Sequence, residues 1–136
     1  MGRSFTFKVK ERPKITSSND AYQCVFSSMQ DLNHEEFKIL LLNRNNRVVK
    51  IETISSGGIA GTVVDPKIIF KRALDAHASS IILCHNHPSG NLKPSQADIN
   101  ITKKIVKAGE SLEIKVLDHL IISEKGYYSF LDEGMI

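Results

Sequence analysis

The segment from residue 80 to residue 98 constrains the fold of this chain most strongly. Ile81–Leu83 form an apolar run typical of a buried strand, and His85 and His87 follow it one residue apart. A turn-forming Pro-Ser-Gly sequence comes next, and Asp98 stands eleven residues after the second histidine. The segment therefore predicts a strand, a compact loop and a helix start. It leaves three interpretations of its polar residues open: a metal site, a phosphate or nucleic-acid loop, and plain turn and cap chemistry.

The remaining sequence alternates between strand and helix patterns. The predicted elements, in order, are a helix after residues 17–20, a strand pair at 37–54, a helix after Asp65-Pro66, a strand at 79–84, a helix at 95–112, and strands at 114–122 and 126–130. Polar residues 43–46 supply the turn of the strand pair. This order favours an α/β domain whose mixed β-sheet is flanked by helices.

Length and composition are those of a compact globular domain. The 136 residues suffice for one domain with a buried core, and 41% hydrophobic with 24% charged residues argue against disorder. We divide the chain into an N-terminal extension with a short helix (1–30) and the main domain (31–136). No apolar run approaches the roughly 18 residues of a membrane span, and the N-terminus lacks the apolar core of a signal peptide. We therefore expect a cytoplasmic protein without membrane contact.

The charge pattern gives little support to nucleic-acid binding. The formal net charge is +3, and the 18 Lys and Arg residues are scattered along the chain. A dedicated DNA-binding surface concentrates its cations, because each one neutralises a phosphate. We therefore expect at most weak and non-specific binding to nucleic acids.

His85 and His87 have the spacing of a metal-binding pair. Alternate residues of a strand face the same side, so both imidazoles point one way while Asn86 points the other way. Neutral imidazole is a common zinc ligand, and Asp98 at the start of the next helix supplies a third donor. Two simpler interpretations stay open: the histidines bind backbone carbonyls in a loop, and Ser95 forms only a capping box with the aspartate.

Taken together, these residues resemble a known signature. His85-x-His87, seven residues, Ser95, two residues and Asp98 reproduce the H-x-H-x7-S-x2-D pattern of the JAMM (MPN+) zinc metalloproteases. The surrounding HNHPSG, PSQAD, VLDHLII and YYSF resemble the RadC family, a bacterial branch often labelled DNA repair protein. The resemblance runs from about Glu35 to the C-terminus, roughly three quarters of the chain. It implies the JAB/MPN fold, a cytidine deaminase-like α-β-α architecture, in a stand-alone form without the helix-hairpin-helix segment of longer members.

The resemblance also implies an enzyme, a zinc hydrolase that cleaves a peptide or isopeptide bond of a protein substrate by zinc-activated water. One Zn²⁺ per chain would be held by His85, His87 and Asp98. Glu35 would act as general acid and base, and Ser95 would stabilise the oxyanion. Two rival functions stay open: a DNA-processing role suggested by the family label, and an inactive MPN scaffold.

Glu35 is preferred over its neighbour Glu36 on physical grounds as well. Glu35 shares a strand face with Phe37, whereas Glu36 falls on the face of Lys38. For either acid the simpler alternative is a solvated charge at the entry to a strand. Glu36 is kept as the fallback.

Other features of the sequence carry less specific signals. Asp118-His119 lies inside an apolar strand, which predicts a structural core histidine with a local hydrogen bond in preference to a partner of the metal site. Gly57, Gly58 and Gly61 predict a turn that lines the cleft.

Overall fold

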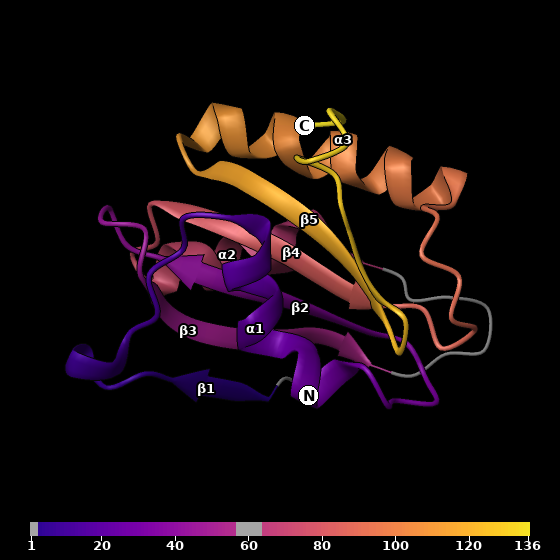
Figure 1. The fold of residues 1–136 in the computed structure, drawn as a ribbon. Coiled ribbons are helices and arrows are strands. Elements are labelled where there is room, and N and C mark those ends of the chain that lie inside the picture. Colours follow the sequence, from indigo (N-terminus) through magenta and orange to yellow (C-terminus); the bar gives the residue numbers. More distant parts are fainter. Residues whose placement is uncertain (1–2, 57–63) are drawn as a thin grey trace.

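The computed structural model describes residues 3–56 and 64–136, which form three layers (Figure 1). In these residues six strands make one sheet in the order β1-β3-β2-β4-β5-β6, with helices on both faces. The predicted mixed sheet flanked by helices is therefore confirmed. The predicted turn at Gly57, Gly58 and Gly61 lies outside the described residues.

A hairpin joins two long neighbouring strands. β2 (Glu36–Leu42) and β3 (Val48–Ser56) pair antiparallel around the predicted polar turn. The side-chain oxygen of Asn43 accepts hydrogen bonds from the backbone N–H groups of Asn45 and Arg47, each at 3.0 Å. An asparagine at this place closes the turn with its own side chain, which is why the polar run could be read from the sequence.

The centre of the sheet combines an antiparallel and a parallel pair. β4 (Ser80–Asn86) runs antiparallel to β2 and parallel to β5 (Lys115–Ser123). A parallel pair needs a long crossover, which α3 (Gln96–Leu112) provides. Every residue of β4 is buried, so the strand that leads to the histidine pair is held on both edges and both faces.

Each face of the sheet has its own hydrophobic core. Side chains alternate along β2, so Leu40 points into one core and Ile39 into the other. α1 (Ser18–Met29) covers the first face, while α2 (Pro66–Asp75) and α3 cover the second. In Figure 1, α1 lies in front of the sheet and α2 behind it.

The predicted helix starts are confirmed at their caps. The Ser17 side chain accepts a hydrogen bond from the backbone N–H of Asp20 at the start of α1. Asp65 does the same for the N–H of Lys67 at 2.9 Å, and Pro66 occupies the first helical position of α2. These bonds satisfy N–H groups that have no partner inside the helix, so the caps fix where each helix begins.

Short strands close both edges of the sheet. β1 (Ser4–Thr6) pairs with β3, and β6 (Gly126–Ser129) pairs with β5. A 3-10 turn, η1 (Val9–Glu11), follows β1. Residues before position 31 thus supply a strand to the sheet and α1 to its first face, and the division of the chain at residue 30 stays a prediction.

One glycine determines how closely α3 approaches the chain that follows it. A Cβ atom at Gly109 would lie 2.3 Å from the carbonyl oxygen of Ile114 and 3.4 Å from the ring of Phe70. The first separation is far below van der Waals contact with a backbone atom. Only glycine therefore allows α3 to pack this closely at its C-terminal end.

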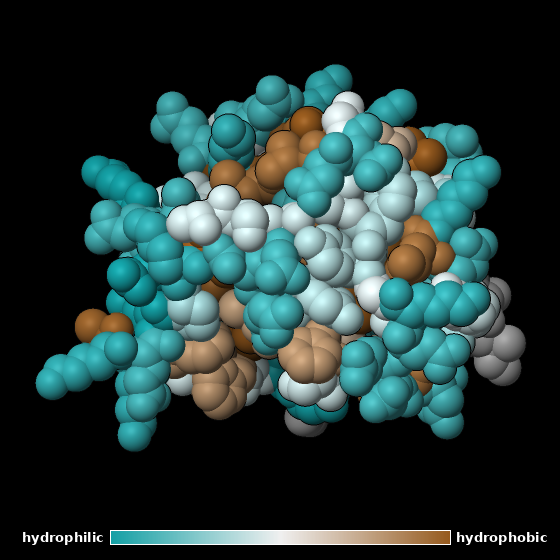
Figure 2. Space-filling view, viewed as in Figure 1, coloured by the Kyte–Doolittle hydropathy of each residue, from teal (hydrophilic) through white to brown (hydrophobic). Residues whose placement is uncertain are grey.

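The side of the described residues drawn in Figure 2 shows hydrophobic residues in separate patches among hydrophilic ones. This side offers no single broad apolar face of the kind that marks a large interface. None of the helices in the described ranges is long and apolar enough to cross a membrane.

Candidate metal centre

Two histidines at the carboxyl end of β4 present their Nε2 atoms to each other. His85 is the penultimate residue of the strand and is 6% exposed, and His87 directly follows the strand. The backbone N–H of His87 donates to the carbonyl of Ile122 at 2.8 Å, so hydrogen bonding to β5 continues past the end of β4. The two Nε2 atoms lie 2.9 Å apart. Both rings therefore face one space, as the alternation along the strand predicts.

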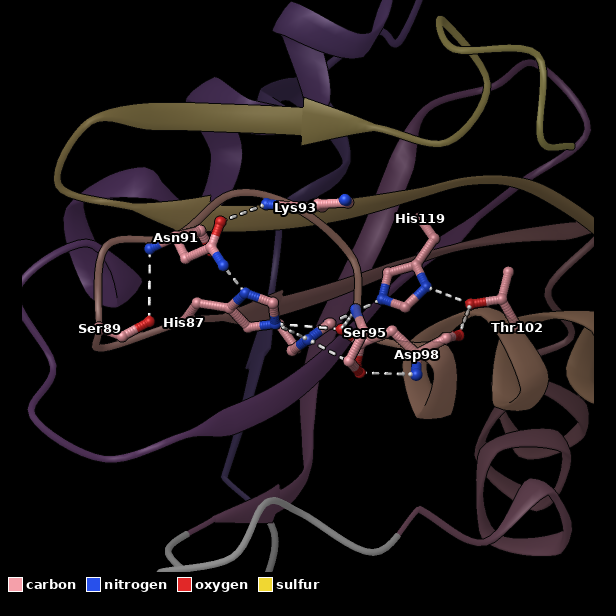
Figure 3. Close-up of polar contacts among 9 residues, drawn as sticks. His87, Ser89, Asn91, Lys93, Ser95, Asp98, Thr102 and His119 are labelled. Atoms are coloured by element: carbon pink, nitrogen blue, oxygen red, sulfur yellow. Dashed lines mark hydrogen bonds and ion pairs between the residues drawn. The ribbon is translucent and has the colours of Figure 1, made fainter.

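A tight turn fixes the orientation of the His87 ring. Gly90 has a φ of +87°, and its backbone N–H donates to the carbonyl of His87 at 3.0 Å. The carbonyl oxygen of Asn91 then lies 2.6 Å from His87 Nδ1 (Figure 3). A carbonyl oxygen can only accept, so Nδ1 carries a proton and the neutral ring has its lone pair on Nε2.

Asp98 belongs to a helix cap and to the histidine cluster at once. Its backbone N–H donates to Ser95 Oγ at 3.0 Å, and its Oδ2 accepts from the Ser95 backbone N–H at 2.8 Å, forming the capping box of α3. Its Oδ1 lies 3.2 Å from His85 Nε2, and Oδ2 lies 3.1 Å from His87 Nε2. Cap and histidine contacts are therefore compatible, and Ser95 joins the site through Asp98 (Figure 3).

The surroundings of Asp98 favour its ionised form. Burial alone would raise the pKa of this carboxyl, but hydrogen bonds with His85 and His87 outweigh it and hold the pKa well below the ordinary value. Burial likewise opposes the charged form of His87, yet the hydrogen bond with Asp98 raises the pKa of that ring. Within the described residues, Asp98 forms ion pairs with these two histidines and with no lysine or arginine.

The two neighbouring glutamates at the start of β2 have different surroundings. Glu35 is half-buried and forms, with His85 and His87, a group whose donor atoms all lie within 4.8 Å of one another. Glu36 is buried and pairs with three basic side chains, those of Arg3, His34 and Lys38. The structure thus brings Glu35, and not the fallback Glu36, to the histidine pair.

Asn86, between the two histidines, holds the backbone on both sides of Glu35. It is 1% exposed. Its Oδ1 accepts from the backbone N–H of Glu36 at 2.7 Å, and its Nδ2 donates to the carbonyl of His34 at 2.9 Å. This clamp fixes Glu35 relative to the strand that leads to the histidines. The sequence predicts only that Asn86 points away from them, because a partner on another strand leaves no local signal.

His119 also contacts the site in a way that the sequence does not reveal. It is 0% exposed, as predicted for a core histidine, and burial holds the pKa of its ring well below the ordinary value. Its Nε2 lies 2.8 Å from His85 Nδ1, and its Nδ1 lies 2.6 Å from Thr102 Oγ1. The neighbouring Asp118 accepts from the backbone N–H of His119 and also from the Ser129 hydroxyl and the Leu131 N–H, so the printed bond between Asp118 and His119 involves the backbone and not the ring. The spacing of four residues places Asp98 and Thr102 on one helix face, but it does not indicate that His119 lies opposite them.

Two overlapping donor sets share the histidine pair. The wider set adds Glu35, with donor atoms within 4.8 Å, and the tighter set adds Asp98, with separations of 2.9, 3.1 and 3.2 Å. Ligands about 2.0–2.1 Å from a tetrahedral zinc ion lie roughly 3.3 Å apart, which agrees with the tighter set. Two imidazole nitrogens and a carboxylate then direct lone pairs into one space. This donor chemistry fits a zinc ion.

Comparison with known proteins identifies the family. The model of the RadC-like JAB domain matches residues 15–135. A UPF0758 protein of Flavobacterium johnsoniae is 57% identical over 122 residues, which are 90% of this chain and 53% of that protein. A UPF0758 protein of Caldanaerobacter subterraneus subsp. tengcongensis is 45% identical over 128 residues, 88% of this chain and 55% of that protein.

A third relative extends the match over nearly the whole chain. A UPF0758 protein of Staphylococcus haemolyticus is 43% identical over 132 residues, 97% of this chain and 58% of that protein. The chain thus spans just over half the length of these relatives. The predicted resemblance is confirmed, because the family model covers most of the residues and the relatives match at 43–57% identity. The chain belongs to the family of RadC-like JAB domains.

Proposed function

We propose that this chain is a zinc-dependent hydrolase of the JAMM type that cleaves a peptide or isopeptide bond. The observation that supports the proposal most is the convergence of His85, His87 and Asp98 at 2.9–3.2 Å. Glu35 stands beside this cluster, as a proton-transfer group must. The chain also carries the complete JAMM pattern in sequence.

In this proposal, His85, His87 and Asp98 hold one Zn²⁺. The bound ion would polarise the scissile carbonyl and lower the pKa of water at the site. The geometry supports this ligand set: the Asn91 carbonyl leaves the Nε2 lone pair of neutral His87 free, and the capping box of α3 holds the Asp98 carboxyl beside it. A preorganised set of this kind does not have to rearrange to bind a cation.

Glu35 would move the proton. Its carboxylate lies within 4.8 Å of the histidine donor atoms, so a single water molecule could connect them. The carboxylate would take a proton from the attacking water and give it to the leaving amine. Asn86 supports this role, because its two hydrogen bonds hold the backbone immediately before and after Glu35.

Ser95 would stabilise the developing oxyanion. In the capping box its Oγ accepts a hydrogen bond from the Asp98 N–H, which leaves the hydroxyl proton available for donation. Ser95 is also exposed, so a substrate can reach it. The cap and the proposed role therefore use different parts of the same hydroxyl group.

The test combines metal content with hydrolysis. Purified wild-type protein should contain one zinc per chain by elemental analysis, and His87→Ala should lose it. On a substrate found by screening peptide and isopeptide libraries, Glu35→Gln should keep its zinc and lose about 10²–10⁴-fold in rate. The matched control is Glu36→Gln, which removes the same charge one residue away and should retain both zinc and activity.

Four outcomes would contradict the proposal. Stoichiometric zinc in His87→Ala would show that the metal binds elsewhere. Equal rates for wild type and Glu35→Gln would remove the proton-transfer role, and a loss confined to Glu36→Gln would move it to the neighbouring residue. Zinc-loaded protein that cleaves nothing in either library would favour a scaffold function.

A further inference from the structure

A series of three hydrogen bonds starts at Nδ1 of His85, whereas Nε2 of the same ring faces the Asp98 carboxylate. Figure 3 labels Thr102 and His119, which form this series. The Thr102 hydroxyl donates to the backbone carbonyl of Asp98 at 2.6 Å. The same oxygen lies 2.6 Å from His119 Nδ1, and His119 Nε2 lies 2.8 Å from His85 Nδ1. The series therefore connects the main chain of one proposed ligand, Asp98, to the ring of another, His85.

The direction of this series follows from its last bond, at the carbonyl of Asp98. A backbone carbonyl can only accept, so Thr102 must use its single hydroxyl proton there. It can then only accept from His119, which places the proton of that neutral ring on Nδ1. His119 Nε2 is left as an acceptor, so His85 must donate from Nδ1. The lone pair of a neutral His85 ring is consequently on Nε2, the atom that faces Asp98 and His87.

We propose that Thr102 and His119 are positioning residues that set His85 in the tautomer required for metal binding. The proposal rests on the metal site of the proposed function and adds two residues outside its ligand set. The neutral His87 ring is held in the same tautomer, with its proton on Nδ1, by a single carbonyl, that of Asn91, which can act only as an acceptor. His119 can donate or accept, so it needs Thr102 to fix its direction.

Packing makes the His119 ring suitable for this task. The ring stacks on Phe130 with centroids 4.7 Å apart and planes 10° apart, and Phe37 contacts it edge-on at 5.7 Å. Both Thr102 and His119 are buried, at 2% and 0% exposure. Solvent therefore does not offer either residue an alternative partner, and the ring cannot turn without disturbing both aromatic contacts.

The decisive measurement is made on wild-type protein without metal. Long-range ¹H–¹⁵N correlation spectra of ¹⁵N-histidine-labelled protein, in buffer alkaline enough to keep the rings neutral, report which nitrogen carries each proton. His85 and His119 should both be protonated on Nδ1. The Asp98 carboxylate by itself would favour a proton on His85 Nε2, so a proton found there would overturn the proposal.

Variants then test what the tautomer does for zinc. Thr102→Val removes the hydroxyl at nearly constant volume and should weaken zinc binding about 10–100-fold, measured by competition with a chromogenic chelator. It should also shift the histidine ¹⁵N signals away from the wild-type tautomers. Thr102→Ser keeps a hydroxyl at this position and should therefore show wild-type zinc affinity and wild-type histidine ¹⁵N signals.

Thr53→Val is the matched control. Thr53 is buried to the same extent, at 2% exposure, and its hydroxyl bonds to Lys38 instead of a histidine. This variant should keep wild-type zinc affinity and histidine spectra. Unchanged affinity and spectra in Thr102→Val, or an equal loss in Thr53→Val, would reduce Thr102 to a packing residue.

The two proposals fail in different ways. Wild-type protein that binds no zinc but shows His85 protonated on Nδ1 would contradict the hydrolase proposal. It would leave the proposed direction of the hydrogen bonds from His85 through His119 to Thr102 in place. Wild-type protein that binds zinc tightly, but whose His85 is protonated on Nε2 before zinc is added, would contradict the roles of Thr102 and His119 and leave the hydrolase proposal in place. The wild-type spectrum decides the tautomer even where Thr102→Val does not fold.

Discussion

Two carboxylate-containing clusters lie on opposite sides of the start of β2, and they balance charge differently. On one side, Glu36 is surrounded by cations of its own chain, Arg3 and Lys38, with His34 as a further partner. On the other side, Asp98 faces two histidines, whose Nε2 atoms lie 3.2 and 3.1 Å from its carboxylate oxygens. We call the first the Glu36 cluster and the second the metal cluster.

The difference shows how neighbouring acidic residues acquire separate roles. The Glu36 cluster brings its own permanent positive charge, so it can stabilise the fold without any ligand. In the described residues, the metal cluster has no lysine or arginine paired with Asp98, so its positive charge must come from protons on the histidines or from a bound cation. Changes in the first cluster should therefore affect stability, and changes in the second should affect binding.

The largest expected effect is that of Asp98→Asn on zinc. Asparagine keeps a side-chain oxygen for the capping box but loses the charge that a divalent ion requires. Zinc affinity should fall by more than the roughly 10–100-fold that loss of an outer partner costs, measured by chelator competition. The free energy of unfolding without metal should change by less than about 1 kcal/mol, because the cap survives. Unchanged zinc affinity in Asp98→Asn would contradict the assignment of zinc binding to the metal cluster.

Glu36→Gln should have the opposite profile. Loss of the charge leaves Lys38 without its carboxylate partner, so unfolding by urea at neutral pH should show a loss of about 1–3 kcal/mol, with zinc affinity unchanged. Glu110→Gln, an exposed site on α3, serves as control and should lose almost nothing. A drop in zinc affinity in Glu36→Gln would show that the two clusters are coupled.

The Glu36 cluster should also respond to pH. Burial favours the neutral acid, but the hydrogen bond with His34 and the charges of Lys38 and Arg3 outweigh it and hold the pKa of Glu36 below its ordinary value of 4.5. A lowered folded-state pKa means that this stabilisation is present above pH 4.5 and is lost as the pH falls through the folded value. The stability difference between wild type and Glu36→Gln should therefore shrink as the pH falls below 4.5.

A smaller effect is expected when the two helix caps are compared. Ser95→Ala and Asp65→Ala should each lower the free energy of unfolding by about 1 kcal/mol, because each removes one cap. Only Ser95→Ala should also weaken zinc binding, by about tenfold, because Ser95 holds Asp98 in place. Equal zinc affinities in the two variants would show that the cap does not position the ligand.

The smallest effect is expected for DNA. Fluorescence anisotropy with two unrelated duplexes should show weak binding that falls steeply between about 50 and 200 mM salt, equal for both sequences and unchanged by zinc. Arg3 and Lys38 already have a partner in Glu36, so these two cations should contribute little to phosphate binding. Tight, salt-resistant and sequence-selective binding would favour the DNA-processing alternative.

The parts of the fold that could be predicted have local causes. Ser17, Asp65 and Ser95 cap their helices within three residues of themselves, so their signals are readable along the chain. Asn43 closes the hairpin turn in the same way. The spacing of His85 and His87 follows from the two-residue period of a strand.

The contacts that could not be predicted join residues far apart in sequence. Asn86 bonds the backbone beside Glu35 about fifty residues away, and His119 reaches His85 only because β4 and β5 are parallel neighbours. Nothing near either residue specifies these partners. Thr102 would ordinarily be assigned to the buried face of α3, and its second role depends on which side chain β5 places opposite it.

The close contact at Gly109 links the C-terminal end of α3 to the position of Asp98 at the N-terminal end of the same helix. Gly109 lies eleven residues from Asp98, about 16 Å along the helix. Its close contact is with the backbone oxygen of Ile114. Any side chain at position 109 would push this end of the helix outward and tilt the other end, where a displacement above about 0.5 Å is enough to spoil a ligand set. A glycine remote from the histidine cluster thus helps to position Asp98, the proposed metal ligand.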